Sequence, residues 1–119
     1  MILDTGILSD DLINNSFKKI ILKDFIEIVV GKINDKLFAF NNICPHRGAS
    51  LSKGNLHGNN IVCYMHGYEY DVFTGKLEDM KSWKKDDTWK EQTPAWRYSD
   101  DLKTYNLYEK DGKILIEIN

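Results

Sequence analysis

The sequence predicts an all-β fold, and three features support that prediction. Two segments in the first half are rich in Ile, Val and Phe, which favour strands. Ile114, Ile116 and Ile118 recur at every second position, as in a strand with one face in a core. Asp111-Gly112, just before them, supplies the positive φ angles of a tight hairpin turn. With 119 residues, 42% of them hydrophobic, the chain has room for one core, and we expect a single domain over residues 1–119.

The first half is expected to form one helical turn and then three strands. Ser9-Asp10-Asp11 can cap a short helical turn that runs through Ile13. Residues 18–22 and 25–33 follow as two strands, and residues 37–40 as a third. The Asn-Asp pair between the last two interrupts the apolar pattern, so a hairpin is predicted there.

The chain is expected to end in a second hairpin. Residues 104–109 and 113–118 are its predicted strands, and they flank Lys110-Asp111-Gly112. The sequence contains no internal repeat and no interdomain linker.

Two short Cys/His segments carry the chemistry. Cys44-Pro45-His46 is followed, after sixteen intervening residues, by Cys63-Tyr64-Met65-His66, so the pattern is C-x-H-x16-C-x2-H. Proline or glycine lies beside each pair and favours a tight loop. Functional side chains are often carried on loops over a rigid scaffold. The sequence therefore predicts a metal centre formed by two loops.

The residue types alone leave several metals open. Thiolates suit zinc, copper(I) and iron-sulfur clusters, and neutral imidazole suits zinc, copper and iron. Zinc fingers usually pair cysteines roughly two to four residues apart and histidines roughly three to five apart. This chain instead mixes one cysteine and one histidine in each loop, which fits two separate iron atoms better than one zinc ion. A zinc-stapled structural or interaction module without redox activity is the alternative.

The residues around these pairs resemble those of the Rieske ferredoxins. The resemblance rests on Cys44–Leu51, on Cys63–Asp71 and on the Thr74-Gly75-Lys76 turn. It includes the glycine after the second histidine and the Asp-x-x-Thr-Gly turn. It covers about residues 25–77 well and the C-terminal hairpin loosely.

The resemblance implies a cofactor, a ligand set and a more detailed fold. One [2Fe-2S] cluster per chain is expected, with Cys44 and Cys63 on one iron. His46 and His66 are expected on the other iron. The implied Rieske iron-sulfur fold has an antiparallel β-sandwich-like base and a small cluster-binding subdomain at about residues 42–77. That subdomain is expected to have three or so strands, with the two loops at its tip.

Departures from the respiratory Rieske proteins are informative. Those proteins carry two further cysteines that link the loops by a disulfide, and the matching positions here are Ala49 and Met65. A serine that donates a hydrogen bond to a cluster sulfide there is matched by Tyr68, whereas a tyrosine that bonds a cysteine sulfur is matched by Tyr70. Because such donors stabilise the reduced cluster, losing one predicts a potential in the low or middle part of the Rieske range.

The histidines are expected to set the redox properties. Two neutral imidazoles in place of two thiolates remove two negative charges, so Rieske centres lie at roughly −150 to +300 mV, against about −400 mV for plant-type clusters. The added electron makes the ligated histidines hold their protons more tightly. The potential is therefore expected to fall as pH rises through the oxidised-state histidine pKa values.

An insertion is expected at about residues 78–92, where the sequence departs from the compact ferredoxin pattern. Pro94 follows it and is expected to belong to the proline loop that covers the cluster in relatives. Trp83, Trp89 and Trp96 lie in or beside the insertion. They are interpreted as packing it onto the sheet, and the alternative is a docking patch for a redox partner or a homo-oligomer contact.

Four other polar residues receive structural interpretations. His57 is the one remaining histidine and is expected to be an exposed loop residue rather than a fifth ligand. Arg47 is interpreted as a surface residue, or as one that attracts an acidic partner. Glu69 and Asp71 share one face of a strand and are interpreted as structural rather than as a pair for acid-base catalysis.

Composition limits the partners and the location. A net charge of −2 and a pI near 5.9 give no basic surface for nucleic acid. The first residues lack the features of a signal peptide, and no apolar run is long enough to cross a bilayer. Two cysteines that both resemble ligands leave none for a disulfide, in keeping with a reducing compartment. We expect a soluble, cytoplasmic monomer or weak homo-oligomer without membrane contact.

The expected function is one-electron transfer rather than catalysis. By resemblance, the setting is a multicomponent oxygenase, in which an NAD(P)H-dependent flavin reductase donates electrons and a terminal oxygenase or another oxidoreductase accepts them. A catalytic oxygenase would need a mononuclear iron site of two histidines and one carboxylate, and His57 is the sole spare histidine. Relatives that serve as small subunits of assimilatory nitrite reductases lose the ligands that this chain keeps.

Overall fold

The computed structural model describes residues 1–45, 48–64, 67–80 and 101–118. Their strands are β1 (Ile2–Leu8), β2 (Ser16–Ile21), β3 (Glu27–Ile33), β4 (Lys36–Asn41), β5 (Asn55–His57), β6 (Asn60–Val62), β7 (Tyr68–Asp71), β8 (Leu77–Met80), β9 (Leu107–Lys110) and β10 (Lys113–Glu117). Three short 3₁₀ turns accompany them, η1 (Ser9–Asp11), η2 (Lys23–Phe25) and η3 (Leu51–Lys53). The predicted all-β class is confirmed.

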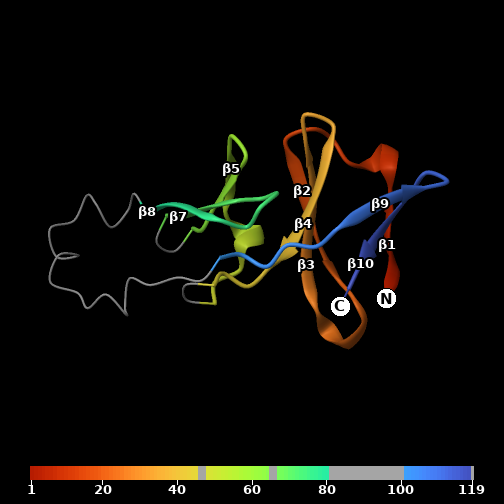
Figure 1. Ribbon diagram of the computed structural model, residues 1–119, viewed down its shortest axis with the longest axis horizontal. Helices are drawn as coiled ribbons and strands as arrows, with labels where there is room; N and C mark the ends of the chain where they lie inside the picture. The colour runs from red at the N-terminus through yellow and green to blue at the C-terminus, as the bar shows by residue number, and fades with distance from the viewer. Residues whose placement is uncertain (46–47, 65–66, 81–100, 119) are drawn as a thin grey trace, which may run out of the picture.

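The strands form three antiparallel sheets, ordered β1-β10-β9, β2-β3-β4 and β5-β6-β7-β8. Figure 1 shows the β2-β3-β4 sheet between the other two, with the β1-β10-β9 sheet on its right and the β5-β6-β7-β8 sheet on its left. The first two sheets make the predicted sandwich-like base. The third sheet is the smaller subdomain, and it has four strands where three or so were expected.

Strand β3 is buried on both of its faces. Ile28 and Val30 are fully buried in the core shared with Ile114 and Ile116 of β10. Val29, which points the other way, is fully buried in the core shared with the third sheet. A strand covered on both sides needs apolar residues at successive positions, which explains the nearly continuous apolar run in this part of the sequence.

Both predicted hairpin turns are confirmed. Asn34 and Asp35 have φ angles of 50° and 64° between β3 and β4, and Asp111 and Gly112 have 53° and 75° between β9 and β10. Positive φ at both central residues gives the turn a twist that matches that of the flanking strands, and Asn, Asp and Gly tolerate it best.

The strand predicted at 104–109 is only partly correct. Strand β9 begins at Leu107, whereas Thr104 forms an isolated antiparallel bridge with Phe40 of β4. The Tyr105 N–H also donates to the Ala39 carbonyl at 2.9 Å. The segment therefore first lies along the free edge of β4 and then enters the other sheet, so it joins the two sheets of the base.

The N-terminal expectation is wrong in two respects. Strand β1 was not predicted, because Gly6, with a φ of 78°, and a register shift between Asp4 and Leu8 interrupt its alternation. The residues expected to cap a helical turn instead form the 3₁₀ turn themselves, from Ser9 to Asp11. No side-chain cap is present, and the Leu12 N–H donates to the Ser9 carbonyl at 3.4 Å.

The insertion predicted at about 78–92 begins within β8 and, from residue 81 on, lies outside the described residues. The three tryptophans and Pro94 lie outside them as well. Among the described residues, no helix has the length and apolar character needed to cross a membrane.

Gly75 provides a test of the contact between the third sheet and the segment before β9. It has a φ of +81°, its carbonyl accepts from the Leu102 N–H at 2.6 Å, and an added Cβ would overlap the Leu102 carbonyl oxygen. We expect Gly75→Ala to lower the free energy of unfolding, measured by urea denaturation, by about 3 kcal/mol or more. Gly112→Ala, with a φ of +75° but open space, should cost only about 1–2 kcal/mol. Equal losses would contradict the role assigned to this contact.

Candidate metal centre

The first cysteine loop, residues 44–49, is closed by two backbone hydrogen bonds. The Cys44 N–H donates to the Ala49 carbonyl at 2.8 Å, and the Gly48 N–H donates back to the Cys44 carbonyl at 2.8 Å. Gly48 has a φ of 76°, which residues with a Cβ adopt only at a cost. Just outside the loop, Ile43 and Ser50 form an isolated antiparallel bridge.

The second cysteine loop, residues 63–68, repeats this arrangement. The Cys63 N–H donates to the Tyr68 carbonyl at 2.8 Å, and the Gly67 N–H donates back to the Cys63 carbonyl at 2.9 Å. Gly67 has a φ of 71°. This loop joins β6 to β7, and the pair of Val62 with Glu69 continues the sheet directly below it. Two different sequences thus make loops with the same closing bonds, each beginning at a cysteine.

Both thiols lie inside the protein. Cys44 and Cys63 are each 2% exposed and belong to one buried cluster that includes Leu51, Tyr68 and Tyr70. The Tyr70 hydroxyl lies 3.6 Å from the Cys44 sulfur. Soft sulfur donors screened from water suit the iron of an iron-sulfur cluster, and a neighbouring hydroxyl can donate to a thiolate. The donor set that is described therefore fits the predicted cluster.

The remaining predicted site residues divide into two groups. Tyr68 and Tyr70, on the same face of β7, are both fully buried. His46, His66 and Pro94 lie outside the described residues, as does Arg47.

Apolar side chains are exposed beside the two loops. Ile43, which precedes the first cysteine, is 48% exposed, and Tyr64, which follows the second, is 52% exposed. The ammonium group of Lys53 lies 5.9 Å from the centre of the Tyr64 ring. Among the described residues, Ile43, Tyr64 and Lys53 thus place exposed apolar surface and a cation near the cysteines.

His57 has a partner that the sequence analysis missed. Its side chain is 65% exposed, as expected, but its Nδ1 lies 3.1 Å from Oε1 of Glu69, a residue only 5% exposed. Asn60 donates to the same oxygen at 3.3 Å. The Gly58-Asn59 turn is the sequence feature that could have indicated this contact. It places His57 opposite Asn60 in a two-residue hairpin, and the strand of Asn60 lies beside the strand of Glu69. His57 is therefore a partner of a buried carboxylate.

Asp71 serves the turn after β7. Its Oδ1 accepts from the N–H groups of Phe73 at 2.8 Å and Thr74 at 3.0 Å. This is the local bonding that makes aspartate common in turns. Glu69 and Asp71 thus contact different groups.

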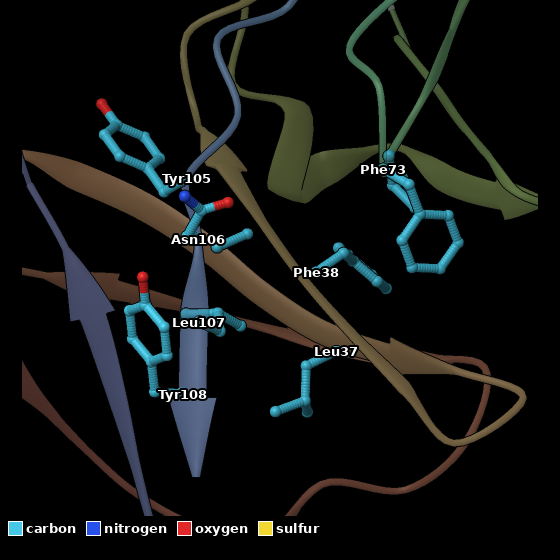
Figure 2. A pocket seen from close by; sticks show the side chains of 9 residues that line it. Leu37, Phe38, Phe73, Tyr105, Asn106, Leu107 and Tyr108 are labelled. Atoms are coloured by element: carbon cyan, nitrogen blue, oxygen red, sulfur yellow. The ribbon is translucent and has the colours of Figure 1, made fainter.

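A pocket of about 280 Å³ lies away from both cysteine loops. Figure 2 shows its lining: Leu37 and Phe38 of β4, Phe73 after β7, and Tyr105, Asn106, Leu107 and Tyr108 leading into β9. No lining residue belongs to residues 44–49 or 63–68. The pocket therefore marks the junction of the sheets and is separate from the metal centre.

The fold and the site define an all-β metalloprotein module with two cysteine loops built alike. Residues 7–106 match the Rieske [2Fe-2S] domain family, and the chain belongs to that family. The predicted [2Fe-2S] cluster and the predicted class of protein are thereby confirmed.

Two curated relatives each match fewer than half of the residues of this chain. The ferredoxin component of the naphthalene 1,2-dioxygenase/salicylate 5-hydroxylase systems of a Ralstonia species is 38% identical over 50 residues, 42% of this chain and 48% of that protein. A methylxanthine N1-demethylase of Pseudomonas putida is 42% identical over 46 residues, 39% of this chain and 13% of that protein. The matched region thus spans about half of the ferredoxin and a small part of the demethylase. Ferredoxin components of dioxygenase systems are thus among the proteins that share this segment.

Solved structures share the fold over nearly the whole chain. The Sphingomonas yanoikuyae B1 ferredoxin superposes with a TM-score of 0.76 at 20% identity, covering 98% of both chains. A chain from the complex of reduced oxygenase and oxidised ferredoxin in carbazole 1,9a-dioxygenase gives 0.75 at 22% identity, covering 97% of this chain and 91% of that one. The predicted Rieske fold is confirmed.

The first prediction for the site concerns the Tyr70 hydroxyl beside Cys44. We expect Tyr70→Phe to lower the midpoint potential by about 20–60 mV, because a donated hydrogen bond worth about 1 kcal/mol favours the more negative reduced state. Tyr108→Phe is the matched control, since the Tyr108 hydroxyl donates to Glu117 at 2.6 Å, a bond that raises the pKa of Tyr108. Protein-film voltammetry measures both. Equal potentials for Tyr70→Phe and the wild type would contradict the contact.

The second prediction for the site concerns His57. Because its described contact is with Glu69, His57→Ala should leave the iron content per chain and the spectrum of the reduced protein unchanged. The free energy of unfolding should fall by about 1–3 kcal/mol, because Glu69 is buried and loses one of its partners. Iron analysis of His57→Ala beside His66→Ala makes the comparison, and iron loss in both variants would show that His57 also serves the cluster.

Proposed function

We propose that this protein is a one-electron carrier that takes electrons from an NAD(P)H-dependent flavin reductase and passes them to a terminal oxygenase or another oxidoreductase. In this proposal Cys44 and Cys63 hold one iron of the cluster, and His46 and His66 hold the other. The two cysteine loops with the same closing hydrogen bonds, in a chain of the Rieske family, are the observation that carries it.

The described residues have three tasks in this function. When bound, the [2Fe-2S] cluster supplies a site that takes up and releases one electron. Burial of both thiols excludes water from the two sulfur ligands, and the Tyr70 hydroxyl is placed to donate to the Cys44 sulfur. The closing bonds of each loop hold its cysteine in one position, so little rearrangement is needed when charge changes.

The proposed partners follow from the relatives and the outer surface of the loops. Ferredoxin components of naphthalene dioxygenase systems and a ferredoxin bound to an oxygenase are among the similar proteins. Ile43 and Tyr64 are exposed beside the loops, and partly exposed apolar side chains suit a short-lived contact with a redox partner. We further propose one domain over residues 1–119, a cytoplasmic location, and a monomer or weak homo-oligomer.

One experiment tests the cluster and its ligands together. Protein purified without oxygen should contain about two iron and two sulfide per chain, and after dithionite reduction it should give the electron paramagnetic resonance signal of mixed Cys/His ligation. His46→Ala and His66→Ala should each lose that signal, whereas His57→Ala should keep it. Zinc in place of iron, with no signal, would replace electron transfer by the structural alternative.

The electron path is tested separately. A flavin reductase with NADH should reduce the wild-type protein, and the reduced protein should then be reoxidised by a terminal oxygenase with its substrate. A protein that holds the cluster yet exchanges electrons with no reductase and oxygenase pair from a naphthalene or carbazole dioxygenase system would contradict the proposed partners.

A further inference from the structure

The two cysteine loops are supported in different ways. Below the second loop, strands β6 and β7 continue as a regular ladder through Val62, Ile61 and Asn60. Below the first loop, the ladder consists of one isolated bridge, between Ile43 and Ser50. The first loop therefore needs another group to fix its base.

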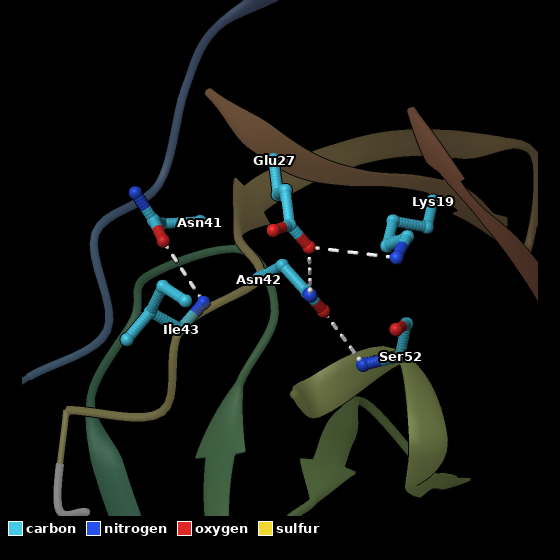
Figure 3. Close-up of polar contacts among 6 residues, drawn as sticks. All are labelled: Lys19, Glu27, Asn41, Asn42, Ile43 and Ser52. Atoms are coloured by element: carbon cyan, nitrogen blue, oxygen red, sulfur yellow. Dashed lines mark hydrogen bonds and ion pairs between the residues drawn. The ribbon is translucent and has the colours of Figure 1, made fainter. Parts of the chain in front are cut away.

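Asn42, two residues before Cys44, provides that group. It is fully buried, and its side chain bonds in two directions, as Figure 3 shows. Its Nδ2 donates to Oε1 of Glu27 at 3.0 Å, and its Oδ1 accepts from the Ser52 N–H at 2.8 Å. Glu27 begins β3 of the base, and Ser52 lies in η3 after the first loop.

The backbone of Asn42 also bonds to Glu27, and it bonds to Leu51, the residue before Ser52. Its N–H donates to the Glu27 carbonyl at 3.0 Å, and its carbonyl accepts from the Leu51 N–H at 2.8 Å. Through Oδ1 the side chain thus adds one more bond to the short ladder below the first loop. Through Nδ2 it ties that ladder to the base.

Glu27, which accepts the hydrogen bond from Asn42 in this network of side chains, is partly exposed at the surface. Oε1 of Glu27 also lies 3.4 Å from the Lys19 ammonium group, and both side chains are partly exposed. The Lys19 ammonium group and the Asn42 amide thus meet at one oxygen of Glu27, and hydrogen bonds to a carboxylate are stronger than those to a neutral acceptor. An exposed ion pair contributes little by itself, so the buried amide is the part of the network that matters.

We propose that Asn42 is the positioning residue of the metal centre: its side chain fixes the first cysteine loop to β3 and thereby sets where Cys44 lies relative to Cys63. This inference rests on the proposed ligand role of the two cysteines. Asn42 touches neither cysteine sulfur in any contact described above, so its effect passes through the backbone between residues 42 and 44.

A double variant in which one hydrogen bond is reversed tests this proposal, and its net charge equals that of the wild type. Asn42→Asp keeps the acceptor for the Ser52 N–H but sets a carboxylate against that of Glu27. Glu27→Gln in the same chain supplies an amide that can donate to Asp at 42, so the double variant restores both bonds with the direction of one reversed. Asn42→Ala removes both bonds.

The measured quantities are the rate at which a chelator removes iron, the spectrum and midpoint potential of the reduced protein, and amide exchange at Ser52 in the cluster-free protein. Asn42→Ala and Asn42→Asp should release iron at least tenfold faster than the wild type, a factor expected when buried bonds worth about 1.4 kcal/mol are lost. Both variants should also have an altered spectrum and an altered midpoint potential in the reduced protein. In Asn42→Ala, the Ser52 N–H should lose its protection from amide exchange. The double variant should return to within about twofold of the wild-type rate.

Two controls separate positioning from stability. Asn14 makes the same kinds of bonds to Asp35, donating to its carboxylate at 3.0 Å and accepting from its N–H at 2.8 Å, outside the cysteine loops. Asn14→Ala and the destabilised Gly112→Ala should keep the wild-type spectrum and potential. If Asn42→Ala fails to fold, Glu27→Ala removes the acceptor of Nδ2 together with the exposed ion pair to Lys19, keeps the bond to Ser52, and should still speed iron release at least threefold.

The outcomes distinguish this inference from the proposed function. An Asn42→Ala protein that melts lower but keeps the wild-type spectrum, potential and iron-release rate would show that Asn42 is merely structural. Failure of the double variant to recover, with Asn42→Asp impaired, would overturn the role of the bond to Glu27. A wild-type protein without the cluster would overturn the proposed function, and this inference with it.

Discussion

The rest of the structure depends on the burial of the β2-β3-β4 sheet between two other sheets. Ile28 and Val30 pack toward the β1-β10-β9 sheet, and Val29 packs toward the subdomain that carries the cysteines. Each core is completed by residues distant in the sequence, such as Ile114 in one and Tyr70 in the other. Because one strand contributes to both cores, its position fixes the base and the metal-binding subdomain together. The subdomain therefore starts from a rigid support.

The two cysteine loops have the same backbone geometry, but different neighbouring residues support them. Gly48 and Gly67 provide positive φ at the same place in each loop, and the same backbone bonds close both. The second loop continues a sheet ladder, whereas the first relies on the buried amide of Asn42. A buried amide with both ends bonded costs little, but one with an unpaired group is expensive, so such a residue specifies a single arrangement.

Around the metal centre, the sulfur groups are buried and their sequence neighbours are partly exposed, an arrangement that suits the proposed electron transfer. The thiols of Cys44 and Cys63 are in the interior, while Ile43 and Tyr64, their sequence neighbours, are about half exposed. In the proposed function, adjacent residues thus serve the cofactor and the surface that a partner meets. Below this region, the buried carboxyl group of Glu69 is held by His57 and Asn60, so a buried polar group is given partners within the sheet.

The sequence by itself determined the β class and both hairpins, because these depend on local signals: turn residues that tolerate positive φ and the periodicity of apolar residues. The spacing of the soft ligands favoured iron over zinc, and the resemblance of their flanking residues to the Rieske ferredoxins indicated the cluster and the family. Strand β1 was missed because Gly6 and a bulge break its alternation, and the start of β9 was misplaced because Thr104 pairs with Phe40 of another sheet. The tertiary structure alone showed that Asn42 joins the first loop to Glu27, and that His57 meets Glu69. These contacts join residues that lie twelve or more positions apart, and only the packing of the sheets decides which of many polar side chains become buried together.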